Sequence, residues 1–319
     1  MKGHRSLNPN SVRNKWMHIN QIIRDKKIGV LLLQEMHMSK TRHDETQKLF
    51  WKRLKIFSSE DPENPTGKGG VAIVLNKALI QTKGQENIKT TEIIPGRALP
   101  MSIKYRPPEP PKLTVLVVYS PNKHGKNKLF WDEIKTFLEN HPHIPRPDIM
   151  AGDFNVVEDT IDRLPTHPDP PDATDTLDSL KSYLRLQDGW HNTYPSTKSY
   201  TFLHSNGSGS QSRIDRIYVK NKMLETAREW KITSSALPNT DHRMVSVQVI
   251  NDSAPNVGRG RWSVPIHLLK DDPLTKYINE CGEEALNKIK NLNRECTDST
   301  NPQIIYHSFK KNIMEMARK

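Results

Sequence analysis

The sequence predicts a mixed α/β domain over about residues 1–251, followed by a linker and a helical segment over residues 252–319. Short apolar runs, which are typical of strands buried on both sides, alternate with segments of helical periodicity as far as Ile250. Beyond Asn251 the composition changes to Pro, Gly and small polar residues, which is typical of a linker. A chain of 319 residues can hold one large domain or two ordinary ones.

Helices are expected where apolar residues recur at intervals of three and four positions. Trp16, Ile19 and Ile23 share one face of the first predicted helix, and Phe130 and Ile134 share one face of the third. Several prolines follow the third helix and end it. The predicted helices cover residues 12–27, 41–55, 126–139 and 174–186.

Strands are expected at apolar runs that are too short for helices, and at runs of alternating polarity. The run from Ile28 to Leu33 suits a strand covered on both sides. Valines alternate with polar residues over 244–250, which predicts a half-buried strand that closes a sheet. A small-residue stretch at 205–212 separates two apolar runs and predicts a hairpin. The predicted strands cover residues 28–33, 69–75, 93–104, 113–119, 149–151, 200–203, 213–219 and 244–250.

The net charge is strongly positive and is concentrated in the predicted α/β domain. The whole chain has 48 Lys and Arg against 36 Asp and Glu, a formal charge of +12. Residues 252–319 contain 11 Lys and Arg and 9 Asp and Glu, so ten of the twelve net charges lie in residues 1–251. Such a balance attracts polyanions, DNA among them. A basic protein without a nucleic-acid partner is the alternative that charge alone leaves open.

Cysteine usage and hydropathy exclude several classes of protein. The two cysteines, Cys281 and Cys296, form no Cys-x-x-Cys spacing, which excludes a zinc ribbon or a disulfide framework as the cause of folding. The longest apolar runs are far shorter than a membrane span, and the N-terminus has no apolar signal region. We therefore expect a soluble intracellular protein, nuclear or cytoplasmic, with no membrane partner.

Five short polar motifs follow or adjoin the apolar runs, in a fixed order. Phosphodiester hydrolysis needs a metal ion to neutralise charge, a base or a positioned water, and a stabilised leaving oxygen. Mg²⁺ prefers carboxylate oxygens and keeps several waters, so one or two acidic ligands suffice. Because the motifs supply carboxylates, an amide, a phenol and an imidazole, together they indicate a phosphate-cleaving metal site. They are Leu-Leu-Gln-Glu at 32–35, Val-Tyr-Ser-Pro-Asn at 118–122, Gly-Asp-Phe-Asn at 152–155, Ser-Arg-Ile-Asp at 212–215 and Thr-Asp-His at 240–242.

Carboxylates in three of the motifs suit roles in such a site. Glu35 ends a buried type of strand and is the natural first metal ligand; a solvated strand-end glutamate is the alternative. Alternation sends Asp153 and Asn155 to the same side, where the carboxylate can orient a water and the amide can hold a phosphoryl oxygen. The alternative there is an Asx turn. Asp215 can fix the tautomer of His242, although each alone is more often a surface or capping residue.

The remaining motif residues leave two interpretations each. Tyr119 follows the four apolar residues Val115 to Val118, so it either packs in the strand or places a phenol near a phosphate. Asn122 is most simply a turn residue. Asp241 is either a second metal contact or a cap.

The motifs resemble the signature of the endonuclease/exonuclease/phosphatase superfamily, which has the DNase-I-like fold. The resemblance implies a four-layered α/β sandwich of two packed mixed sheets, and hydrolysis of phosphate esters that depends on Mg²⁺, with Mn²⁺ as the alternative ion. Within the superfamily the chain is similar to the endonuclease domain of non-LTR (LINE-type) retrotransposon polyproteins. That similarity is carried by Gln-Glu-Met-His at 34–37, Lys-Gly-Gly-Val-Ala at 68–72, Gly-Arg-Ala-Leu at 96–99 and Tyr-Thr-Phe at 200–202.

The resemblance implies a role for each matching residue. The metal ligands would be Glu35 and Asp241. The catalytic residues would be Glu35, Tyr119, Asp153, Asn155, Asp215 and His242. Among them, Asp153 would orient or activate the attacking water, and Asn155 and Tyr119 would hold the phosphate. The nucleic-acid contacts would be Asn122 at the scissile phosphate, and Thr201 and Arg213 near the DNA.

The resemblance also implies what lies at the two ends. Relatives open with a strand that ends in Asn close to the metal; here Met1-Lys2-Gly3 resembles the turn that follows it, so we expect that strand to be missing. Residues 258–264 resemble the segment that links the endonuclease to a reverse transcriptase, which is the C-terminal domain of a full-length relative. No Tyr-x-Asp-Asp motif occurs.

The resulting expectation is a metal-dependent DNA endonuclease that nicks a target strand and leaves a 3′-hydroxyl for priming. Two enzymes of the same superfamily are alternatives: an abasic-site endonuclease and a phosphoinositide phosphatase. A non-catalytic, truncated remnant of such an element is the alternative from a different class.

Overall fold

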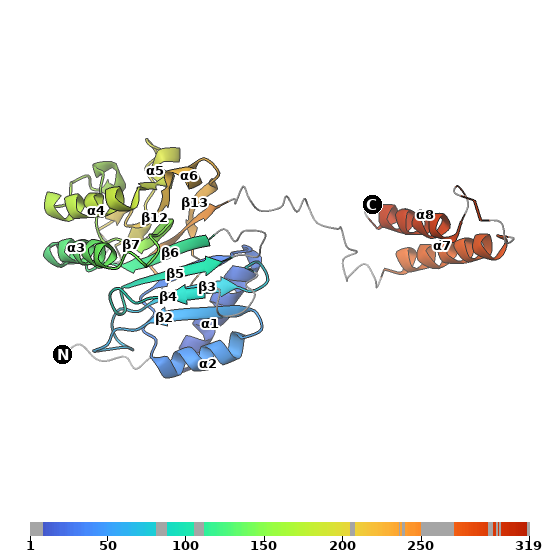
Figure 1. Cartoon of the computed structure of the whole chain (residues 1–319), viewed down its shortest axis with the longest axis horizontal. Helices are drawn as coiled ribbons and strands as arrows, with labels where there is room; N and C mark the ends of the chain where they lie inside the picture. The colour runs from blue at the N-terminus through green and yellow to red at the C-terminus, as the bar shows by residue number, and fades with distance from the viewer. Residues whose placement is uncertain are drawn as a thin grey trace. The chain divides into compact units, whose positions relative to one another are not determined.

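The computed structural model describes residues 9–80, 88–104, 112–204, 208–235, 237, 240–249, 271–292, 296–297, 299 and 301–317. The chain divides into two compact units, Met1–Ala254 and Pro255–Lys319 (Figure 1). The segment that bears on a missing first strand, Met1-Lys2-Gly3, lies outside the described residues, as does the predicted linker.

The first unit alternates strands and helices. Its helices are α1 (Pro9–Asp25), α2 (Lys40–Phe50), α3 (His124–Asn140), α4 (Pro171–Leu184), α5 (Gly189–Thr193) and α6 (Asn221–Leu224), with a 3-10 turn at Thr160–Asp162. Its longer strands are β1 (Val30–Gln34), β2 (Leu54–Ser59), β3 (Val71–Asn76), β5 (Ala98–Lys104), β6 (Lys112–Tyr119), β7 (Ile149–Asp153), β12 (Asp215–Lys220), β13 (Arg228–Ser234) and β14 (Arg243–Gln248). Its short strands are β4 (Ile88–Thr90), β8 (Arg163–Leu164), β9 (Leu186–Asp188), β10 (Phe202–Leu203) and β11 (Gln211–Ser212).

A mixed sheet and an antiparallel sheet form the centre of this unit. One has six strands in the order β4-β5-β6-β7-β12-β9, and only the β6–β7 pair in it is parallel. The other has three strands in the order β1-β3-β2, all antiparallel. Strands β13 and β14 pair with each other, and β10, β11 and β8 form a small separate sheet.

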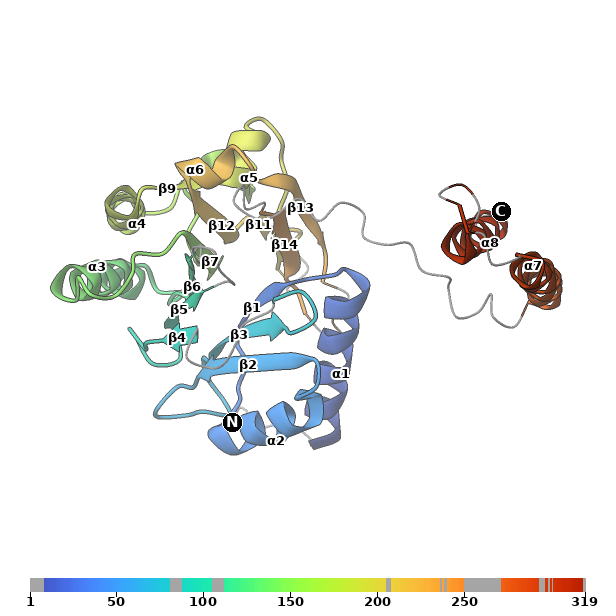
Figure 2. The same cartoon turned by 45° about the vertical axis from the view of Figure 1, so that its right-hand side comes forward.

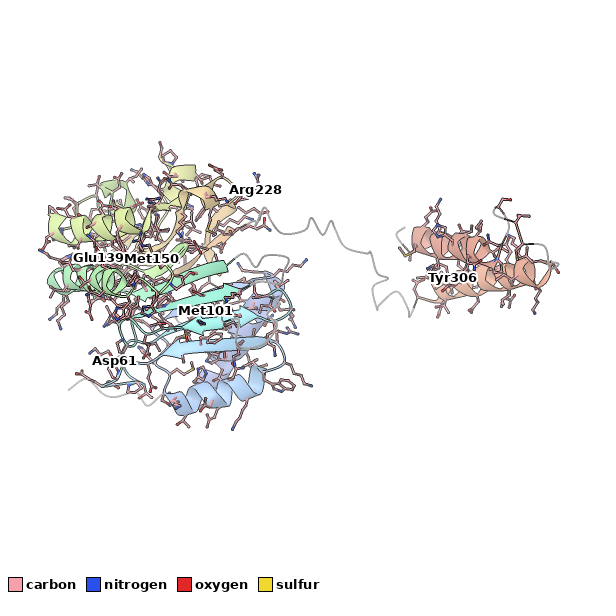
Figure 3. All side chains as sticks on the ribbon, viewed as in Figure 1. Asp61, Met101, Glu139, Met150, Arg228 and Tyr306 are labelled. Atoms are coloured by element: carbon pink, nitrogen blue, oxygen red, sulfur yellow. The ribbon has the colours of Figure 1, made fainter. Side chains whose placement is uncertain are left out.

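Among the described residues, four buried hydrophobic clusters hold the layers together and give a four-layered α/β sandwich (Figure 2). Alternate residues of β5 and β6 point in opposite directions, so each strand contributes to clusters on both faces of the sheet. Met101 of β5 lies between the two sheets, whereas Met150 of β7 lies under α3 and α4 (Figure 3). Trp16 of α1 and Phe50 of α2 cover the outer face of the three-stranded sheet. The predicted fold class is confirmed.

Three predicted elements were wrong in their bounds or pairing. The helix predicted over 41–55 ends at Phe50, because Gln47 turns back to accept a hydrogen bond from Ile56 N at 2.8 Å and fixes the start of β2. The strand predicted over 93–104 begins only at Ala98, after a turn at Gly96. The predicted hairpin does form, but between β10 and β11; β12 pairs with β7 instead.

The second unit is a pair of helices, α7 (Asp272–Lys290) and α8 (Pro302–Met316). Each begins with a side-chain cap: Asp271 accepts from Leu274 N at 2.9 Å, and Asn301 accepts from Ile304 N at 3.0 Å. The Phe309 ring lies beside Gly282, where an added Cβ would make an ordinary van der Waals contact at 3.7 Å. Among the described residues, no helix is long and apolar enough to cross a membrane.

Candidate active site

Three neighbouring strands of the six-stranded sheet bring polar side chains to one edge. Tyr119 ends β6, Asp153 ends β7 and Asp215 begins β12. The register pairs Tyr119 with Asp153 across the parallel β6–β7 ladder, and Asp215 with Asp153 across the antiparallel β7–β12 ladder. These three residues therefore stand in one row across the sheet, with Asp153 in the middle.

A glycine makes this row possible. Gly152 has φ +150, and a Cβ at that position would lie 1.9 Å from the carbonyl oxygen of Val118. Only glycine lets β6 and β7 approach this closely immediately before Asp153. This explains the first residue of the Gly-Asp-Phe-Asn motif in structural terms.

Asn155 is tied to Asp153. It adopts a left-handed backbone with φ 47, and its backbone N donates to Asp153 Oδ1 at 3.0 Å. Its side-chain Nδ2 donates to Asp153 Oδ2 and to Ser120 O, both at 3.0 Å. In this arrangement the amide hydrogens orient Asp153, so a contact of Asn155 with a phosphate stays a prediction.

Asp215 holds the ring of His242. Nδ1 of His242 lies 2.9 Å from Asp215 Oδ2, and because an ionised carboxylate can only accept, Nδ1 is the donor. The Phe202 ring packs against the imidazole with centroids 4.8 Å apart. The hydroxyl of Thr201 accepts from Ile214 N at 3.1 Å and Asp215 N at 3.0 Å, which fixes the start of β12.

Glu35 reaches the same place from the other sheet. It follows β1 with φ 50, and the backbone pairing continues beyond it, where Met36 N donates to Gly70 O at 3.1 Å. The Tyr119 hydroxyl donates to the Glu35 carboxylate. The guanidinium of Arg97 lies 5.1 Å from the Tyr119 ring centroid and donates to Tyr119 O at 3.1 Å. The Tyr119 side chain therefore connects the Glu35 carboxylate, which follows β1 of the three-stranded sheet, to the strand ends of the six-stranded sheet.

These groups line one cleft of about 900 Å³. The predicted site residues that line it are Glu35, Tyr119, Asn122, Asp153, Asn155, Asp241 and His242. Three histidines that the sequence did not single out, His124, His167 and His204, line it as well. Asp215 supports His242 from behind.

Thr201 and Arg213 are not placed where a direct DNA contact would need them. Thr201 is fully buried and Arg213 is 2% exposed. Arg213 donates to Asp162 and to Asp188 at 2.7 Å, so its guanidinium forms ion pairs inside the protein. Both side chains are therefore buried in this structure and are not presented to solvent for a contact with DNA. They position the segment that carries Asp215.

A buried group of charges lies beside this segment. No local sequence signal predicts it, because its members are far apart in the sequence. Arg216 is 1% exposed and donates to Val156 O at 2.8 Å and Asp162 Oδ2 at 3.2 Å. Tyr218 donates to Glu158 at 2.5 Å. Burial alone would raise the pKa of Glu158, but Arg216 and Lys181 outweigh it and hold the pKa at about 2.

Asn127 is a further residue that sequence reasoning missed, because it falls inside an ordinary helical pattern. It is fully buried at the start of α3. Its amide donates to Ser120 Oγ at 3.0 Å and Phe154 O at 2.9 Å, and accepts from Trp131 at 2.6 Å. It thereby joins the two loops that follow Tyr119 and Asp153.

Burial and neighbouring carboxylates shift the pKa values of three groups at the strand ends. Burial raises the pKa of Asp153 to about 8, and the charge of Asp215 adds to the effect. Burial alone would lower the pKa of His242, but its hydrogen bond to Asp215 and the charge of Asp215 raise it to about 9. Burial, and then the hydrogen bond to Glu35, raise the pKa of Tyr119. His242 is therefore a cation at neutral pH.

The residues present fit a hard cation that keeps most of its waters. No three His, Cys, Asp or Glu side chains in the described ranges form a ready metal cage. Glu35 is an exposed carboxylate at the cleft, held by Tyr119, and Mg²⁺ needs only one or two such ligands. Asp241 also lines the cleft and is exposed, with its Oδ1 3.9 Å from His242 Nε2.

Comparison with known proteins decides the family. Residues 12–246 match the Endonuclease/Exonuclease/phosphatase family. The chain belongs to this family. The resemblance drawn from the motifs is confirmed.

Individual proteins that are similar to this chain agree with the family assignment. The chain is 26% identical over 280 residues to the transposon TX1 uncharacterized 149 kDa protein of Xenopus laevis, covering 86% of this chain but only 20% of that relative. Its fold is similar to the AP endonuclease LMAP from Leishmania major, with TM-score 0.60, 15% identity, and coverage of 74% of this chain and 82% of that one. It is also similar to the endonuclease domain of TRAS1, a telomere-specific non-LTR retrotransposon, with TM-score 0.53, 16% identity, and coverage of 75% and 93%. At these identities the two structures establish the fold.

Proposed function

We propose that this domain hydrolyses phosphodiester bonds in DNA, nicking one strand of a duplex in a Mg²⁺-dependent reaction that leaves a 3′-hydroxyl suited to priming. The observation that carries the proposal is the row formed by Tyr119, Asp153 and Asp215, with His242 and Glu35 beside it in one cleft. The positive charge of residues 1–251 supports a polyanionic substrate.

Each residue has a role that its contacts permit. Asp153, oriented by Asn155, would position the attacking water and, in its ionised form, receive the proton of that water. Because the pKa of Asp153 is raised to about 8, the ionised fraction grows as the pH rises toward 8. His242 is held by Asp215 through Nδ1 and would donate from Nε2 to a phosphate oxygen, where negative charge develops. Asn122, exposed at the cleft, would contact the scissile phosphate.

Glu35 would hold the Mg²⁺, or Mn²⁺ in its place, and Asp241 would be a second contact. The bound cation would neutralise charge on the scissile phosphate and on the leaving oxygen. Tyr119 would fix the Glu35 carboxylate, since its hydroxyl donates to that group. In a full-length relative a reverse transcriptase in the same chain would use the new 3′-hydroxyl.

A comparison of substrates tests the proposal against its alternatives. The purified chain is incubated with plain duplex, duplex with an abasic site, and a phosphoinositide, each with Mg²⁺ and with EDTA. We expect cleavage of plain duplex with Mg²⁺ only. Cleavage confined to abasic duplex would establish a repair endonuclease, release of phosphate from the lipid alone would establish a phosphatase, and inactivity of folded protein on all three would establish a remnant.

A further inference from the structure

The turn between α2 and β2 presents a tryptophan to solvent. Trp51 is 58% exposed, whereas the other tryptophans in the described part of the chain are at most 5% exposed. An indole exposed to that degree forgoes much of the free energy that burial would contribute. Its position on the surface therefore calls for a contact outside this chain's own core.

Cations surround this indole. Lys52 and Arg53 are exposed on the same turn, and Lys77 is exposed just after β3. The ammonium groups of Lys52 and Lys77 lie 5.9 Å and 5.7 Å from the Trp51 ring centroid, and Lys77 Nζ donates to Trp51 O at 2.9 Å. Within the described residues none of the three cations forms an ion pair with a carboxylate. We call Trp51, Lys52, Arg53 and Lys77 the Trp51 patch.

The Trp51 patch is separate from the candidate active site. Strand β3 pairs with β1 and β2, so its two ends mark the two ends of the sheet (Figure 2). Val71 of β3 is paired with Gln34, beside Glu35, whereas Asn76 is paired with Leu54, beside the patch. The five residues of β1 span ~17 Å at ~3.3 Å each. A nucleotide at Glu35 therefore cannot also contact Trp51.

We propose that the Trp51 patch binds single-stranded nucleic acid, with a base stacked on the indole and neighbouring phosphates bound by Lys52, Arg53 and Lys77. Cations that form no ion pair with a carboxylate in the described part of the chain can bind phosphates, and an exposed aromatic ring beside them offers the stacking surface that single strands use. A duplex keeps its bases stacked inside and cannot use the ring. An anionic membrane fits less well, because the patch has one aromatic side chain and no apolar stripe.

Binding is measured by fluorescence anisotropy of a labelled 20-nucleotide single strand in EDTA, with the full chain. We expect Trp51→Ala, and the double variant Lys52→Ala/Lys77→Ala, each to weaken binding about 10-fold. Trp51→Tyr, which keeps an aromatic ring, should retain most of it. The double variant should also reduce the slope of log affinity against log salt by about 1.4, the value for two lost phosphate contacts on a single strand. DNA and RNA single strands are compared to distinguish the two sources of the ligand.

A matched control distinguishes binding at the Trp51 patch from nonspecific attraction by the positive charge of the whole unit. Lys222→Ala/Arg228→Ala removes two exposed cations elsewhere in the same unit (Arg228 is labelled in Figure 3) and should leave single-strand binding within twofold. Equal losses in this control and in the patch variant would overturn the proposal, as would equal competition by duplex or stronger binding to anionic vesicles. Because the assay requires no cleavage, its result does not depend on the proposed hydrolysis.

Discussion

His242 Nδ1 lies 2.9 Å from Asp215 Oδ2, across 27 positions of sequence. The hydrogen bond joins the first residue of β12 to the loop before β14 and fixes which ring nitrogen faces the cleft. It also contributes to the electrostatic state of the imidazole. Burial alone would lower the pKa of His242, but the hydrogen bond to Asp215 and the charges of Asp215, Asp153 and Asp241 together outweigh burial.

Removing the charge of Asp215 should change the titration of His242. The pKa of His242 is raised to about 9, so the imidazolium persists through neutral pH; in Asp215→Asn the ring should lose its proton at a pH much closer to its ordinary 6.5. NMR of the imidazole C–H signals in EDTA measures this directly. We expect the cleavage rate at pH 7.5 to fall by about 10²- to 10⁴-fold in His242→Ala and to fall in Asp215→Asn as well. An unchanged His242 titration in Asp215→Asn would contradict the pairing.

Tyr119→Phe removes only the hydroxyl that donates to Glu35. Because an unoriented ligand binds a cation less well, we expect Mg²⁺ to bind or to support cleavage about 10- to 100-fold less effectively. Calorimetric Mg²⁺ titration and the Mg²⁺ dependence of the rate both report this. The control is Tyr194→Phe, since Tyr194 is 40% exposed and does not line the cleft. Equal Mg²⁺ affinity in both variants would exclude a role for Tyr119 in ligand orientation.

Gly152→Ala should destabilise the sheet at the site. The added Cβ would lie 1.9 Å from Val118 O, so β6 and β7 must separate, and we expect a loss of about 3 kcal/mol or failure to fold. Gly125→Ala is the matched control: it adds the same methyl group within α3, where nothing lies within 4 Å, and should stabilise by about 0.5–1 kcal/mol. Urea unfolding of both variants measures the difference.

The Glu158 carboxylate should make stability depend on pH in the acid range. Its pKa of about 2 lies below the ordinary 4.5, so its contribution is present above pH 4.5 and is lost as the pH falls toward 2. Glu158→Gln should cost about 3 kcal/mol at neutral pH and flatten the stability profile between pH 4.5 and 2. Glu133→Gln, at an exposed position of α3, should follow the wild-type profile. A Glu158→Gln profile as steep as wild type would show that the ion pairs with Arg216 and Lys181 do not contribute.

Much of the fold could be predicted because its signals are local. The apolar run before Glu35 and the periodic positions of α1 and α3 depend on near neighbours in the sequence. Strand β2 was missed because its apolar residues, Leu54 and Ile56, also fit helical spacing from α2, and the pairing with β3 decides between them. Tertiary contacts overrode the local pattern there.

The site was predictable to the extent that its residues end strands. Asp153 and Asp215 come together because β7 and β12 are neighbours in the sheet. No local sequence pattern predicts this strand pairing, whereas the resemblance implied that both residues are catalytic. The burial of Thr201 and Arg213 could not be predicted, because burial depends on residues distant in the sequence: Arg213 forms its ion pairs with Asp162 and Asp188. The support that Asn127 gives to two loops is likewise invisible without the fold.

Conversion of supercoiled plasmid to nicked circle by the purified chain in Mg²⁺, beside Asp153→Ala and the surface control Asp132→Ala, tests the central claim most directly. We predict nicking by wild type and by Asp132→Ala, abolition by EDTA and by Asp153→Ala, and extension of the nicks by a DNA polymerase, which requires a 3′-hydroxyl. Nicking that persists undiminished in folded Asp153→Ala would show that the reaction does not occur at this site.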